Sequence, residues 1–90
     1  MITLTKYGAT WCPPCKMMKP VLKELRKIHP TWKIIEIDID QNEKLADKEN
    51  IQSVPTLIFS DGKKTKRKAG FMNKIEIETF VKKTFGGDSQ

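Results

Sequence analysis

The 90-residue sequence has few residues of the kinds that build a crosslinked or metal-stabilised domain. It contains two cysteines and one histidine. Two cysteines cannot form the multi-disulfide framework of a small secreted domain, and with two residues between them they close too short a loop to staple a fold. A structural zinc site needs about four ligands, and His29 is the only other soft ligand. We therefore expect the cysteines to be chemical rather than structural, and we expect no metal site.

Long hydrophobic runs are also absent. No stretch approaches membrane-spanning length, and residues 1–6 lack the apolar segment of about 7–15 residues that is typical of a signal peptide. The sequence thus predicts a cytoplasmic protein without a membrane partner. Ninety residues leave no room for a second domain, so we expect one domain over residues 1–87 and a short flexible tail over residues 88–90.

Acidic residues are outnumbered by basic ones. The chain has 17 Lys and Arg against 11 Asp and Glu, a formal charge of +6, concentrated in residues 16–27 and 63–68. A nucleic-acid site would interleave basic residues with exposed aromatics or place them on a groove-reading helix, and the second stretch contains no aromatic residue. Solvated surface is therefore the expected role of this charge. Acidic protein partners are the next alternative, and nucleic-acid binding is not expected.

Hydrophobic periodicity and turn signals predict seven elements. Apolar residues at helical spacing predict amphipathic helices over 13–28 and 73–85, and a shorter helix is expected over 43–50. Strands are expected over 2–7, 32–39, 55–59 and 65–69. The run 32–39 is dense in isoleucine, which is typical of a central strand with both faces covered.

The order β-α-β-α-β-β-α then predicts the fold. The first two strands are joined through a helix and must be parallel, while the last two form a hairpin. We therefore expect an α/β fold with a four-stranded mixed sheet and helices on both faces. Asn42 is expected to cap the short helix, and Asn73 with Glu76 to form a capping box at the start of the last one.

The cysteines, Cys12 and Cys15, lie at the start of the first helix, directly after a strand and turn. Pro13 suits the first helical position, where a missing N–H costs nothing. Free N–H groups there, with those of Cys15 and Lys16 the nearest, and the positive end of the helix dipole should stabilise a Cys12 thiolate. They should lower the Cys12 pKa below the free value of about 8.5. Residues three apart on a helix are close enough to form a disulfide. The sequence thus predicts thiol–disulfide exchange, with Cys12 as the nucleophile and Cys15 resolving the mixed disulfide.

The segment Trp11-Cys12-Pro13-Pro14-Cys15-Lys16 resembles the active-site motif of the thioredoxin family, which usually has glycine in place of Pro13. The helix proline, the end of the central strand, the cis-proline motif and two glycines of that family correspond here to Pro20, residues 38–42, residues 54–57, and Gly62 with Gly70. The resemblance covers nearly the whole chain. It implies a thioredoxin-like fold that lacks the N-terminal strand and helix of an ordinary thioredoxin.

The resemblance also implies an activity, that of a protein-disulfide reductase. Such a protein binds no cofactor beyond its redox-active disulfide and draws electrons from NADPH through a thioredoxin reductase. Its partners would be that reductase and disulfide-containing client proteins, and it would act as a monomer in electron transport and redox homeostasis. The Val54–Pro55 bond would be cis, which leaves the Val54 backbone to pair with a substrate strand. The implied substrate-binding residues are Trp11, Pro13, Pro14, Val54, Pro55, Gly70 and Phe71; for Trp11, ordinary packing beside the helix is the alternative.

Two positions depart from the family pattern. Thioredoxins usually carry a buried aspartate six residues before the first cysteine, where this chain has Lys6, and the lysine commonly paired with it corresponds to Glu36. We expect Lys6 and Glu36 to form a partly buried pair behind Cys15, with Glu36 assisting proton removal from the resolving thiol. An exposed pair of little effect is the alternative. The second departure is Gly8, where thioredoxins often have tryptophan, and it leaves one side of the site less covered.

Two other functions remain open at this point. A glutaredoxin-like oxidoreductase reduced by glutathione would be of similar size, although Trp11 and residues 55–57 favour the thioredoxin side. A redox domain that serves as a subunit of a larger complex would keep the fold and make the cysteines incidental. In that case residues 63–68 would supply the contact surface.

Overall fold

The computed structural model describes residues 1–86. Its elements follow the predicted order: β1 (Thr3–Gly8), α1 (Pro13–Ile28), β2 (Lys33–Asp38), α2 (Glu43–Lys48), β3 (Thr56–Ser60), β4 (Thr65–Ala69) and α3 (Lys74–Phe85). The expected end of the domain at residue 87 and the expected tail over residues 88–90 lie outside the described residues.

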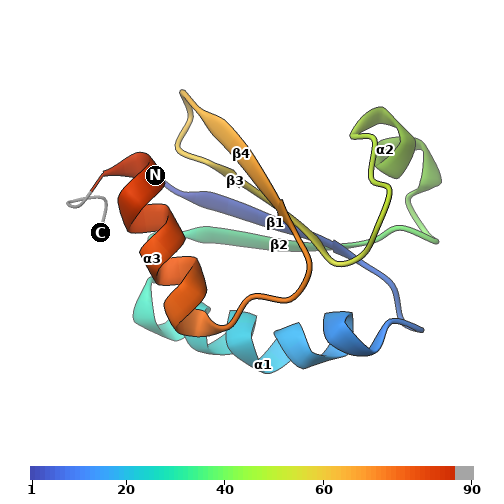
Figure 1. Cartoon of the computed structure of the whole chain (residues 1–90), viewed down its shortest axis with the longest axis horizontal. Helices are drawn as coiled ribbons and strands as arrows, with labels where there is room; N and C mark the ends of the chain where they lie inside the picture. Colours follow the sequence, from blue (N-terminus) through green and yellow to red (C-terminus); the bar gives the residue numbers. More distant parts are fainter. Residues whose placement is uncertain (87–90) are drawn as a thin grey trace.

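The four strands form one mixed sheet in the order β2-β1-β3-β4. β1 pairs in parallel with β2 and antiparallel with β3, and β3 pairs antiparallel with β4. Helices α1 and α3 lie together on one face of the sheet, and α2 lies on the other side, beyond the end at which β1 and β2 finish (Figure 1). The predicted fold is confirmed, including helices on both sides of a mixed sheet.

The expectation that the isoleucine-rich strand is central is wrong. β2 is an edge strand, none of its residues is buried, and β1 and β3 take the central places. The reason is that each face of β2 is half covered. Ile34 packs against the main core, while Ile39, just after the strand, packs against the cysteines. A nearly continuous apolar run therefore reports two partly covered faces and does not require a strand on each side.

The main core lies between the sheet and the helix pair α1 and α3. Along β1 and β3 every second side chain points into it, and α1 and α3 add side chains at helical spacing. Its fully buried members from these elements are Leu4, Met18, Leu22, Leu25, Leu57, Phe59, Ile77 and Val81. Each contributes about 1.5–3 kcal/mol by burial, which fixes α1 on the sheet. Ile28, which continues the apolar spacing that predicts this helix, is exposed at the helix end.

The two shorter helices, α2 and α3, differ in how their N-termini are capped. The capping box of α3 is confirmed, because Asn73 Oδ1 accepts the Glu76 N–H at 2.8 Å and Glu76 Oε1 accepts the Asn73 N–H at 2.8 Å. Asn42 occupies the N-cap position of α2 but does not cap it through its side chain. Its Nδ2 donates instead to the Asp38 carbonyl oxygen at 3.0 Å, which closes the turn after β2.

Candidate active site around Cys12 and Cys15

The turn between β1 and α1 delivers Cys12 to the helix start. The Cys12 N–H donates to the Ala9 carbonyl at 3.2 Å, and Cys12 then serves as the N-cap of α1. Its Sγ accepts the N–H of Cys15 at 3.2 Å. The Lys16 N–H, also expected to face the sulfur, donates instead to the Cys12 carbonyl at 3.1 Å, as the first regular helix bond. One backbone donor, not two, therefore points at Cys12 Sγ.

Cys12 and Cys15 form a disulfide, with 5.2 Å between their Cα atoms. Both residues are buried, with 4% and 2% of their surfaces exposed. Ala9 joins them in a small cluster, with Ile39 and Val54 packed against it. The first turn of α1 contains no acidic residue, so the positive end of the helix faces the sulfurs without a neutralising carboxylate in that turn.

The loop before β3 faces the cysteines. The Val54–Pro55 peptide bond is cis, as the resemblance implied, and the Val54 carbonyl oxygen lies 3.7 Å from Cys12 Sγ. Pro55 is fully buried, and its carbonyl accepts the Gly70 N–H at 2.8 Å. Gly70 has a φ of 96°, a conformation that favours glycine. These bonds bring Val54, Pro55 and Gly70 to the cysteine side of the sheet.

Aromatic and proline side chains rim this surface. Trp11 is 62% exposed and Phe71 is 39% exposed, while Pro13 and Pro14 lie exposed at the first turn of α1. Trp11 is oriented by a hydrogen bond from its Nε1 to Asp40 Oδ2, 2.8 Å long. Asp40 was not among the predicted site residues, although it lies in the segment 38–42 that resembles the family pattern.

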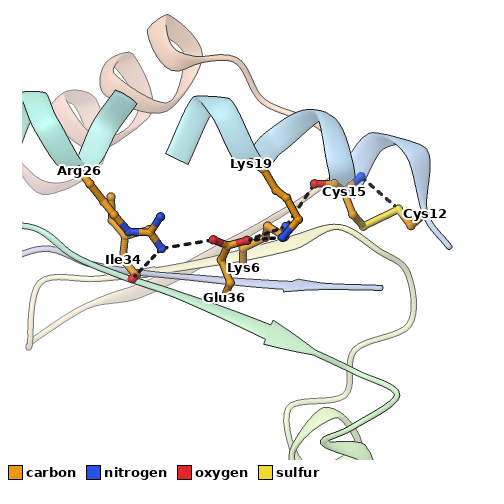
Figure 2. A network of polar contacts seen from close by, with 7 residues as sticks. All are labelled: Lys6, Cys12, Cys15, Lys19, Arg26, Ile34 and Glu36. Carbon is orange, nitrogen blue, oxygen red and sulfur yellow. Dashed lines mark hydrogen bonds and ion pairs between the residues drawn. A yellow bond between two sulfur atoms is a disulfide. The ribbon is translucent and has the colours of Figure 1, made fainter. Parts of the chain in front are cut away.

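Behind Cys15, a network of charged side chains joins β1, β2 and α1 (Figure 2). Lys6 is buried and its Nζ donates to the Cys15 carbonyl and to Glu36 Oε1, both at 3.2 Å. Glu36 also contacts Lys19 Nζ at 3.4 Å and Arg26 Nη2 at 3.3 Å. The structure thus brings Lys6 and Glu36 together, with Glu36 shared among three cations.

The Glu36 carboxylate responds to this network. Its side chain is 28% exposed. Partial burial raises the pKa of Glu36, but the hydrogen bond and charge of Lys6, together with Lys19 and Arg26, outweigh it, and the pKa lies below its ordinary value of 4.5. Glu36 is therefore ionised at neutral pH.

A pocket of about 370 Å³ opens beside this network. Its lining residues come from β1, the following turn, the start of α1 and β2; they include Lys6, Gly8, Cys15, Lys19, Glu36 and Asp38. Gly8 opens the pocket, because a side chain at this position would stand against Cys15 and Lys6. Cys15 and Glu36 therefore line one common, solvent-accessible space.

Residues 1–86 contain no group of three or more His, Cys, Asp and Glu residues that could hold a metal ion. The Nε2 of His29 instead contacts Glu78 Oε2 at 2.7 Å, and its ring stacks on Trp32. Within the same residues, no helix is long and apolar enough to cross a membrane.

The fold and this site define the class of protein. A cysteine pair at a helix N-terminus, faced by a cis-proline loop and free to alternate between dithiol and disulfide, is the site of a thiol–disulfide oxidoreductase.

Comparisons with known proteins identify the family. The family model described as Thioredoxin matches residues 1–83. The chain is 38% identical over 84 residues to the thioredoxin of Bacillus subtilis, a match that covers 91% of this chain and 81% of that protein. It is 35% identical over 77 residues to the thioredoxin of Mycoplasmoides gallisepticum, covering 84% and 77%. A solved thioredoxin structure from Nicotiana alata superposes with a TM-score of 0.82 at 30% identity, covering 91% of this chain and 71% of that one.

The chain belongs to the thioredoxin family. It is a protein-disulfide reductase that cycles Cys12 and Cys15 between dithiol and disulfide, and the glutaredoxin-like alternative is not favoured.

Proposed function

We propose that Cys12 is the attacking cysteine of this reductase and Cys15 the resolving one. The observation that carries the assignment is the Cys15 N–H aimed at Cys12 Sγ at 3.2 Å, at the positive end of a 16-residue helix. This environment favours the thiolate at Cys12. In the dithiol form, the Cys12 thiolate attacks a client disulfide, and one client sulfur leaves as a thiolate and takes a proton. Cys15 then attacks Cys12 Sγ, the second client sulfur leaves with its electron pair, and two electrons have passed to the client.

The client would lie along the exposed rim in extended form. In our proposal Trp11, Phe71, Pro13 and Pro14 supply apolar contacts on either side of the sulfurs. Val54 supplies the backbone groups with which a client strand pairs, and Pro55 and Gly70, joined to each other by a backbone hydrogen bond, complete the binding surface beside it. The Val54 N–H supports this, because it donates to no group within residues 1–86 and so is available to a partner.

Glu36 is proposed to accept the proton of the Cys15 thiol through the shared pocket, with Lys6 as its partner. Its ionised state at neutral pH supports an accepting role, although a lowered pKa makes it a weak base. Glu36→Gln should then slow the resolution of the mixed disulfide and change its pH dependence. An unchanged rate and pH profile would remove Glu36 from the mechanism.

We place the protein in the cytoplasm as a monomer of one domain over residues 1–87, in redox homeostasis and electron transport. We propose that it receives electrons from NADPH through a thioredoxin reductase. The basic stretch over residues 63–68 is assigned to solvated surface; four of its residues form most of the exposed strand β4. Acidic protein partners are the next assignment for that stretch, and nucleic acid is not proposed as a partner.

The test is the reduction of insulin by NADPH, a thioredoxin reductase and this protein. The wild-type protein should support turnover, Cys12→Ser should abolish it, and Cys15→Ser should accumulate a mixed disulfide with the client. Lys23→Met, on the exposed face of α1, is the control. Turnover only with glutathione and glutathione reductase would favour a glutaredoxin-like enzyme. A Cys12→Ser protein that keeps its biological role would indicate a subunit of a larger complex.

A further inference from the structure

Lys6 is a buried cation that lies directly behind the resolving cysteine. Only 4% of its surface is exposed, and its Nζ donates to the carbonyl of Cys15 itself. Burying an ammonium is costly unless it is paired and hydrogen-bonded, and here Glu36 and the Cys15 carbonyl supply those partners. Figure 2 shows Lys6 reaching from β1 toward the first turns of α1, between Glu36 and Cys15.

Gly8 allows this approach. Gly8 and Lys6 lie on the same face of β1, two residues apart. A Cβ at Gly8 would lie 2.9 Å from Lys6 Cε and 3.2 Å from Cys15 Sγ. Lys6 Cε and Cys15 Sγ therefore border the same empty point and are at most about 6 Å apart. The charged Nζ is bonded to this Cε, and a charge so close to an ionisable group shifts the proton affinity of that group.

The other charged groups around Cys15 do not cancel this effect. Lys16 and Lys19 of α1 line the same pocket, opposite Glu36 and Asp38 of β2. Glu36 is divided among Lys6, Lys19 and Arg26. The Asp38 carboxylate accepts the Asp40 N–H at 2.8 Å. Three lysines and two carboxylates thus line the pocket. Of these five side chains, Lys6 is the one that donates a hydrogen bond to the backbone of Cys15.

We propose that Lys6, held by Glu36 and given room by Gly8, is a positioning residue that stabilises the Cys15 thiolate while the mixed disulfide is resolved. This inference rests on the proposed function. The Cys15 thiol releases its proton through the pocket, to water or to Glu36. The thiolate then attacks Cys12 Sγ, the bond between Cys12 and the client breaks, and the Cys12–Cys15 bond forms. The client sulfur leaves with the electron pair and takes up a proton from solvent. The charge placed behind Cys15 is thus the Lys6 ammonium, bound to the Cys15 carbonyl.

The experiment follows the two steps separately. Mixing the reduced protein with 5,5′-dithiobis(2-nitrobenzoate) releases one thionitrobenzoate when Cys12 attacks and a second when Cys15 resolves the mixed disulfide. The pH dependence of the second phase reports the Cys15 thiolate. For Lys6→Met, we expect the midpoint of that profile to move up by about one pH unit and the second phase at pH 7 to slow by about tenfold.

A charge reversal separates electrostatics from structure. Lys6→Asp combined with Glu36→Lys keeps an ion pair at this place but puts the anion next to Cys15. We expect it to raise the midpoint at least as far as Lys6→Met does, and we expect Lys23→Met, on the exposed face of α1, to leave the midpoint unchanged. If Lys6→Met does not fold, Lys6→Gln replaces it, because the amide keeps a donor without the charge.

The outcomes distinguish this inference from the proposed function. If the second phase of Lys6→Met and of the charge reversal has the same pH profile as the wild-type protein, the role of Lys6 is overturned. The assignment of Cys12 as nucleophile would survive that result, because it is tested by the first phase and by insulin reduction. Loss of the first phase from the wild-type protein would instead overturn the assignment of Cys12 as nucleophile.

Discussion

Replacing Gly8 by alanine is expected to destabilise the oxidised protein by about 1–2 kcal/mol. The new Cβ would lie 2.9 Å from Lys6 Cε, so the end of the lysine chain must move. The Nζ bonds to the Cys15 carbonyl and to Glu36 are 3.2 Å long, and a shift of about 0.5 Å takes both beyond hydrogen-bond range. Hydrogen bonds to charged groups contribute about 1.5–3 kcal/mol, of which the displaced ammonium regains part by hydration in the pocket. Alanine also lowers the conformational entropy of the unfolded chain relative to glycine, which offsets about 0.4–1 kcal/mol of this loss of stability.

Urea unfolding of the oxidised protein measures this change, and a fall in Tm of about 4–8 °C per kcal/mol accompanies it. The informative control is the same substitution in a Lys6→Ala background, where the atom that the new Cβ meets is gone. Most of the destabilisation should then disappear, which gives a coupling free energy between the two positions. A neutral or stabilising Gly8→Ala would refute the reasoning. So would a cost that persists in full without Lys6, because the contact with Cys15 would then be its source.

Four further changes have defined outcomes. Glu36→Gln should lower stability above pH 4.5 and lose this effect in acid. The folded pKa of Glu36 is lowered, so its contribution is complete above the unfolded value and vanishes as pH falls through the folded one; a gap that is constant with pH would contradict this. Phe59→Ala, at a fully buried site, should cost about 3–5 kcal/mol in guanidinium unfolding. Asn73→Ala removes the capping box of α3 and should cost about 1 kcal/mol. Trp11→Ala should lower kcat/KM for insulin about fivefold but leave reduction of a small disulfide unchanged, and equal losses would exclude a docking role.

Most of the fold is predictable because several local signals agree. The apolar spacing of residues 13–28, the proline start of that helix and the Asn73 capping box each indicate the element that forms. The position of β2 in the sheet is not predictable in this way. The isoleucines Ile34, Ile35 and Ile37 show that both faces of β2 are partly covered, and partial cover on each face does not decide whether a second strand lies beside β2.

Some features of the site could be predicted from the sequence and others could not. Sequence spacing alone was sufficient to predict that Cys12 and Cys15 can form a disulfide, because a helix fixes the geometry over three residues. The cis bond before Pro55 came from the family resemblance, since local sequence sets only a weak preference. The hydrogen bond from Trp11 to Asp40 joins two loops 29 residues apart, and the division of Glu36 among three cations depends on the register of β1 with β2. Such contacts between distant residues follow from the packed fold.

Lys6 and Gly8 appear in the sequence as two separate departures from the family, and the structure joins them physically. A tryptophan at position 8 would occupy the space through which the Lys6 chain passes, because even a Cβ there meets that chain at 2.9 Å. A lysine at position 6 beside a large residue at position 8 would have to leave the Cys15 carbonyl, and Glu36 would lose its innermost partner. The inverted charge behind Cys15 therefore requires the small residue two positions later. Lys6→Asp with Gly8 retained should reverse the sign of the charge behind Cys15 without filling the pocket, so the effects of positions 6 and 8 can be measured separately.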